Sequence, residues 1–144
     1  MKQQKRIVLL LIFQLFLSWL SLSKDLTFID YENYRFNERA TLDNVLEHAI
    51  LLPLIMMGCS IVSGIFAICF NEKNIFDFVS KCAFFAVSGA TISGLLYICF
   101  RAIMYGPQKE GMLHFLLFPI VGSIAFIVSA VLSSIIFFVK KKNN

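Results

Sequence analysis

Four long apolar runs, each free of charged residues, constrain this chain more than any other feature of its sequence. They cover residues 7–22, 50–70, 82–100 and 113–139. A helix needs about 20 mostly apolar residues to cross the hydrocarbon core of a bilayer. With 58% hydrophobic and 15% charged residues, the chain has too little polar sequence to cover these runs in water. The sequence therefore predicts an all-α integral membrane protein built as a bundle of four transmembrane helices.

The N-terminal segment, residues 1–23, has the layout of a targeting sequence. Lys2, Lys5 and Arg6 precede the first apolar run, as they do in a signal anchor or a signal peptide. Ser21 and Ser23 have the small-x-small spacing that a signal peptidase accepts. We expect an uncleaved anchor with a first span at about residues 7–23. Cleavage after Ser23 is the alternative, and it would leave a bundle of three helices.

The remaining chain, residues 49–144, is predicted to form the membrane domain. Its spans are expected at about residues 50–70, 82–100 and 113–139. Pro53 is expected to bend the second span, and Tyr105-Gly106-Pro107 to end the third helix. The fourth run exceeds the thickness of the hydrocarbon core, so we expect a kink near Pro119 and Gly122.

The positions of lysine and arginine predict the orientation, because both residues favour the cytoplasmic side of short loops. With the N-terminus inside, the cytoplasmic segments contain Lys2, Lys5, Arg6, Lys73, Lys81, Lys140, Lys141 and Lys142. The outer segments contain Lys24, Arg35, Arg39, Arg101 and Lys109. Both termini are therefore predicted to be cytoplasmic, with a basic tail over residues 140–144. Arg101, at the outer end of the third run, is the charge that argues against this orientation.

The largest polar segment, residues 24–48, is predicted to be an acidic, aromatic loop outside the cytoplasm. Its aromatic side chains suit a surface at the level of the lipid headgroups. The residues predicted to contact a partner there are Tyr31, Glu32, Tyr34 and Arg35. The alternative is a solvated loop that only connects two spans.

Small residues recur at intervals of four within the last three runs. Helices in a bilayer associate through close packing of small residues, and this spacing places them on one stripe of a helix. The predicted packing positions are Ser60, Gly64, Ala86, Ala90, Gly94, Ala125, Ser129 and Ser133. We expect these stripes to form contacts inside the bundle; the alternative is that Ala86, Ala90 and Gly94 bind a partner helix.

The apolar runs contain no Asp, Glu, Lys or Arg, and His114 lies at the very start of the fourth run. The absence of ionisable groups between the ends of the runs argues against a pump, a proton-coupled transporter or an intramembrane protease. Gln14 is the amide at depth in the first run, and we expect it to bond to a neighbouring helix. The four cysteines are expected to be free thiols, and the sequence predicts neither a cofactor nor a metal site. The basic residues form no stripe, so a nucleic-acid partner is not expected.

The resulting hypothesis is a non-catalytic membrane protein that binds another membrane protein or itself. In general character it is similar to immunity, exclusion or accessory-subunit proteins, an analogy of type that rests on no motif. One alternative is an oligomeric pore or transport subunit lined by Gly64, Gly89 and Gly122; another is a membrane enzyme using His48 or His114. The abundance of Phe, Ile, Lys and Asn suggests an AT-rich coding sequence, which favours a bacterium or a mobile element, so the bacterial inner membrane is the expected location. The terminal Lys141-Lys142-Asn143-Asn144 resembles a retrieval signal of the endoplasmic reticulum, the alternative location.

Overall fold

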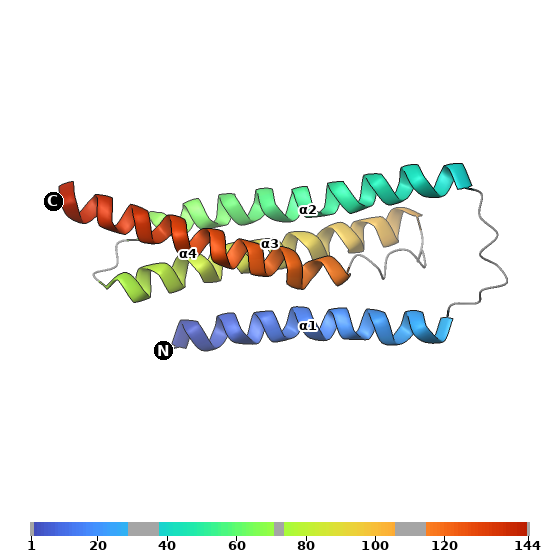
Figure 1. Ribbon diagram of the computed structural model, residues 1–144, viewed down its shortest axis with the longest axis horizontal. Coiled ribbons are helices and arrows are strands. Elements are labelled where there is room, and N and C mark those ends of the chain that lie inside the picture. The colour runs from blue at the N-terminus through green and yellow to red at the C-terminus, as the bar shows by residue number, and fades with distance from the viewer. Residues whose placement is uncertain (1, 29–37, 71–73, 106–114, 144) are drawn as a thin grey trace.

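The computed structural model consists of four long helices that run alternately up and down the molecule (Figure 1). It describes residues 2–28, 38–70, 74–105 and 115–143. The helices are α1 (Lys2–Phe28), α2 (Glu38–Ile68), α3 (Ile75–Tyr105) and α4 (Leu117–Asn143). Both termini lie at one end of the bundle, together with the end of α2 and the start of α3 (Figure 1). This end is called the terminal end below.

Three of the described helices are long and apolar enough to cross a membrane. The stretches that meet this condition are Ile50–Ile68, Ile75–Phe100 and Leu117–Lys142. Large apolar side chains on their outer faces are more than half exposed, Val62, Leu96 and Ile127 among them. In water such a surface would be unfavourable, whereas lipid tails solvate it. α1 has 27 residues and is long enough, but it is less apolar than the other three helices.

α3 is the central helix, since it contacts each of the other three. Its most extensive contact is with α2, and α4 packs against both of these helices. α1 lies against α3 and α4, and within the described residues it makes no contact with α2. α1 is therefore a peripheral helix that contacts the bundle through α3 and α4 only, among the described residues.

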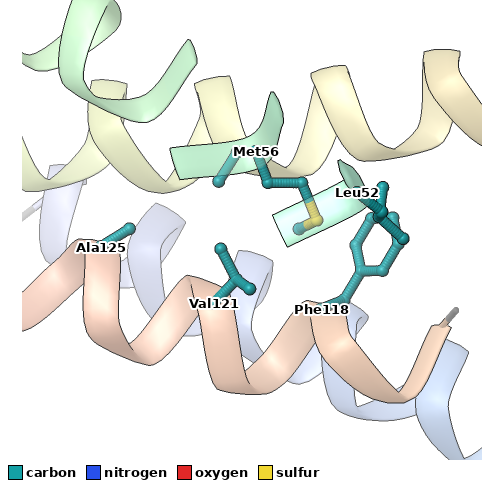
Figure 2. Close-up of a cluster of buried hydrophobic side chains, with 6 residues drawn as sticks. Leu52, Met56, Phe118, Val121 and Ala125 are labelled. Atoms are coloured by element: carbon teal, nitrogen blue, oxygen red, sulfur yellow. The ribbon is translucent and has the colours of Figure 1, made fainter. Parts of the chain in front are cut away.

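The main core lies between α2, α3 and α4 (Figure 2). Leu52 and Met56 of α2 point toward Phe118 and Val121 of α4 in this cluster. Ala90 of α3 and Ala125 of α4 complete it as small residues that let the helices approach. A second cluster, formed by Ala67, Phe78 and Cys82, lies toward the terminal end.

Hydrogen bonds satisfy backbone groups at the start of α3 and at the end of α2. The Asn74 side chain accepts a hydrogen bond from the Phe76 amide at 3.2 Å, so Asn74 caps the start of α3. At the end of α2, the amides of Cys69 and Phe70 donate to the carbonyls of Phe66 and Ala67, each at 3.2 Å, and close the last turn. α3 is described as far as Tyr105, directly before the Gly-Pro pair expected to end it.

The helices extend further than the apolar runs. α1 continues to Phe28 and α2 begins at Glu38, so helical residues occupy both ends of the segment expected to be a loop over 24–48. α3 begins at Ile75 and includes Asp77 and Lys81, which the sequence pattern assigned to the inner loop. An α-helix bonds its own backbone groups, so it continues into water or headgroups until glycine, proline or a cap ends it. Residues 24–48 contain neither glycine nor proline.

Two prolines take different places in their helices. Pro53 lies inside α2, as expected. Pro119 does not lie in a helix interior: α4 begins at Leu117, so Pro119 is in its first turn. First-turn amides have no partner within a helix, and the missing N–H of proline breaks no bond there. A proline in the first turn does not by itself bend a helix, and the kink expected near Pro119 and Gly122 stays a prediction.

Candidate functional site

A buried polar cluster joins α1 to the rest of the bundle. The Gln14 side chain is fully buried, and its Nε2 donates a hydrogen bond to Oγ1 of Thr91 on α3 at 2.7 Å. Thr91 Oγ1 in turn donates to the backbone carbonyl of Val87 at 2.7 Å. Because the hydroxyl proton of Thr91 is used in this way, its oxygen can only accept from Gln14, which fixes the orientation of the amide. The interhelical bond expected for Gln14 is confirmed.

Gly122 of α4 provides the space that the Gln14 side chain occupies. A Cβ atom at residue 122 would lie 2.6 Å from Nε2 and 2.7 Å from Cδ of Gln14, and closer still to Oε1. Any other residue at this position would therefore displace the amide. Gln14 Oε1 is buried and has no hydrogen-bond partner among the described residues.

A second polar contact lies one turn further along α1. Ser18 Oγ donates to the backbone carbonyl of Phe115 at 3.2 Å, just before α4 begins. Ile7, Gln14 and Ser18 are the buried side chains on this face of α1, at spacings that place them on one stripe. Amide and hydroxyl groups are uncharged at neutral pH. The cluster therefore positions α1 and offers no proton-transfer group.

α2 packs directly against the α3 backbone at Gly89. A Cβ atom there would lie 2.9 Å from the backbone carbonyl oxygen of Cys59 and 2.9 Å from Cβ of Ser63. At Gly94, a Cβ would lie 2.7 Å from Cζ of Phe118 and 3.0 Å from Sδ of Met56. Both glycines let neighbouring groups pack directly onto the α3 backbone.

The structure places most of the predicted packing positions inside the bundle. Ser60, Ala86, Ala90, Gly94, Ala125 and Ser133 are buried. A Cβ atom added at Gly64 would lie 3.9 Å from Cβ of Ala86. Ser129 is half-buried. Ser133 Oγ donates to the Ser129 carbonyl at 2.6 Å, so these serines pair with their own helix. Ala86, Ala90 and Gly94 are enclosed by neighbouring helices and are not presented to a partner.

Several predicted residues lie outside what is described. Tyr31, Glu32, Tyr34 and Arg35 fall in the segment 29–37, which the structure does not describe. His114 falls in another such segment, and for His48 only the backbone, within α2, is described. In the described part of the chain, no three His, Cys, Asp or Glu side chains are grouped so that they could hold a metal ion. All four cysteines are described as free thiols.

Two lysines rest on aromatic rings at the terminal end. Lys81 Nζ lies 4.6 Å from the ring centroid of Phe70, and Lys140 Nζ lies 5.9 Å from that of Phe78. Lys140 Nζ also donates to the Ile68 carbonyl at 3.2 Å and so satisfies a carbonyl at the end of α2. Ammonium groups over ring faces gain a favourable electrostatic interaction. We call Lys81, Lys140, Phe70 and Phe78 the basic–aromatic cluster.

Sequence reasoning singled out neither the packing roles of Gly89 and Gly122 nor the basic–aromatic cluster. Both glycines were predicted as pore-lining candidates, and Gly122 also as a kink position. In the structure, the Ser63 side chain lies beside Gly89 and the Gln14 side chain lies beside Gly122. The glycines carried a usable signal, because a glycine in a membrane helix permits close approach. Comparisons of the chain with protein-family models, curated proteins and solved structures found no match.

Proposed function

We propose that this chain is a multi-pass membrane protein that acts by contacting another membrane protein, without catalysing a reaction. The supporting observation is that its small and polar residues make contacts within the bundle. The stripes on α2, α3 and α4 are packed against one another, and the polar groups of Gln14 and Thr91 bond to each other. Within the described residues, these side chains are therefore used for contacts inside the bundle. Its large outward apolar side chains and the segment 24–48 are the surfaces left for a partner.

The proposal includes α1 as a retained first span, with both termini in the cytoplasm of a bacterial cell. Gln14 supports retention, since removal of α1 would remove the amide that donates to Thr91 and would uncover the backbone at Gly122. The arrangement of both termini at one end supports a common side for them (Figure 1). The lysine distribution supports the cytoplasmic side.

The pore alternative receives less support from the same contacts. Its proposed lining included Gly89 and Gly122, and neighbouring side chains occupy the space beside both. Within one chain these glycines are packing positions. We therefore propose recognition by the segment 24–48, with Tyr31, Glu32, Tyr34 and Arg35 as the contact residues.

Site-specific photo-crosslinking in cells of the source organism tests this function. A photoreactive amino acid replaces Tyr31 or Tyr34, and matched controls carry it at Leu96 or Ile127, both exposed on the apolar surface. We expect the same partner protein in the adducts from both tyrosine positions, with little adduct at the two control positions. Charge reversal of Glu32 and Arg35 should lower the adduct yield.

Two results would count against this assignment. Adducts that are no more frequent at Tyr31 and Tyr34 than at Leu96 and Ile127 would remove the segment 24–48 as the contact surface. Adducts consisting only of two copies of this chain would favour the oligomeric alternative, and conductance in planar bilayers would then decide whether the assembly is a pore.

A further inference from the structure

The described residues at the terminal end carry a strong excess of positive charge. Lys5 and Arg6 of α1 are exposed, as are the three lysines over residues 140–142 of α4, and Lys81 of α3 is half-buried. Asp77 is the acidic side chain described at this end. Most of these basic groups extend from helix ends, but Lys81 and Lys140 are held at fixed places by the basic–aromatic cluster.

The two ammonium groups of this cluster lie beside one shared apolar base. Phe78 packs with Ala67 and Cys82 in a buried cluster, and Phe137 lies 5.8 Å from it, centroid to centroid. The Phe70 ring stacks on Phe85 at 5.9 Å, on the other side. Rings of α3, of α4 and of Phe70, just after the end of α2, therefore surround both ammonium groups. Lys140 uses one of its three N–H donors on the Ile68 carbonyl, which leaves donors for another acceptor.

The cluster lies near the ends of the apolar stretches. Lys81 is six residues after the start of Ile75–Phe100, and Lys140 is two residues before the end of Leu117–Lys142. Long basic side chains near the ends of a membrane helix can extend their ammonium groups toward the headgroups. Phe76 and Phe138 are more than half exposed nearby in sequence on the same helices. Ammonium groups next to exposed apolar side chains suit a ligand that has an anionic head and acyl chains.

We infer that the basic–aromatic cluster is a binding site for the phosphate of an anionic phospholipid, with its acyl chains against the outer faces of α3 and α4. Basic pockets between membrane helices on the cytoplasmic side bind such headgroups through this chemistry. The inference depends on the proposal that the helices span a membrane, but not on the identity of a protein partner. Photo-crosslinking at Tyr31 and lipid binding at Lys81 can therefore succeed or fail separately.

Native mass spectrometry of the full chain in mild detergent tests the site. Phosphatidylglycerol is added as the anionic probe and phosphatidylcholine as the zwitterionic control. The test variant is K81Q/K140Q, and the matched control is K141Q/K142Q, which removes the same charge from the same end. We expect bound phosphatidylglycerol to exceed phosphatidylcholine, to fall about tenfold in K81Q/K140Q, and to stay within about twofold of wild type in K141Q/K142Q.

The single variant K81Q is a control for misfolding of the double variant, because it leaves the Lys140 contact with Ile68 intact. It should lose several-fold in lipid binding while it elutes as wild type does in size-exclusion chromatography. Equal binding of both lipids, or an equal loss in the two double variants, would overturn the inference. Displacement of bound lipid by millimolar inorganic phosphate would also overturn it, since the site would then accept any phosphate and not the lipid.

Discussion

Gln14 makes two different contacts with one amide group. Its Nε2 donates to Thr91 on α3, and the whole group lies against Gly122 on α4. Interhelical hydrogen bonds in membranes contribute about 0.6 kcal/mol on average and up to about 1.7 kcal/mol. The bond by itself therefore adds little stability. Its larger effect is to position α1, because the same amide bonds to α3 and occupies the space beside Gly122 of α4.

Gly122→Ala tests this role of the glycine. The added Cβ would meet the Gln14 amide at less than 3.0 Å, so the amide must move and its bond to Thr91 is strained or lost. Such overpacking costs about 1–3 kcal/mol. We expect the variant to unfold at a lower fraction of sodium dodecyl sulfate in mixed micelles. Unfolding is monitored by the fluorescence of the single tryptophan, Trp19.

A matched glycine and a rescue variant make the test specific. No atom lies within 4 Å of a Cβ at Gly58, so Gly58→Ala should change the free energy of unfolding by about 0.5 kcal/mol or less. Gln14→Ala together with Gly122→Ala should be no less stable than Gln14→Ala alone, since the clash has been removed. Additive losses in the double variant would show that Gly122 acts independently of Gln14.

At the scale of helices, the contact between α2 and α3 depends on a backbone approach at Gly89. The Cys59 carbonyl that faces this glycine belongs to the α2 backbone and cannot rotate away. A Cβ at this position must therefore separate the two helices. At Gly64 the nearest atom to an added Cβ is Ala86 Cβ at 3.9 Å, which is an ordinary van der Waals contact.

Gly89→Ala should accordingly destabilise the protein, by about 1–3 kcal/mol, whereas Gly64→Ala should cost about 0.5 kcal/mol or less. The measurement is the temperature at which half of the protein leaves the monomer peak in size-exclusion chromatography after heating in detergent. If the two variants lose monomer at the same temperature, Gly89 does not set the distance between α2 and α3.

Sequence patterns predicted the helices that the apolar runs specify, but not the places where these helices begin. The apolar run starting at Cys82 is obvious, yet α3 begins at Ile75 because the Asn74 cap and backbone bonding determine helix ends. The effect of Pro119 likewise depends on where α4 starts. Gln14 was predictable, because an amide in hydrocarbon must find a partner. Its partners, Thr91 and Gly122, come from helices distant in sequence and required the structure.

At the scale of the whole molecule, charge and packing favour the same arrangement independently. The lysine distribution predicts one side of the membrane for both termini, and the bundle places both termini at one end. Neither observation uses the other. An odd number of spans would separate the termini, so the proposal of a common side for both termini includes α1 as a retained span. The orientation and the retention of α1 are thus one hypothesis.

Reporter fusions after Lys24, Asn74, Gln108 and Asn144 test this hypothesis, combined with an epitope tag before Met1. Alkaline phosphatase folds only outside the cytoplasm, where its disulfides form. We expect it to be active at Lys24 and Gln108 only, and a cytoplasmic fluorescent reporter to be active at Asn74 and Asn144. The mature chain should keep the N-terminal tag and show the full mass. The reverse reporter pattern would contradict the lysine argument, whereas loss of the tag would show that α1 is removed and that the mature protein lacks the bond between Gln14 and Thr91.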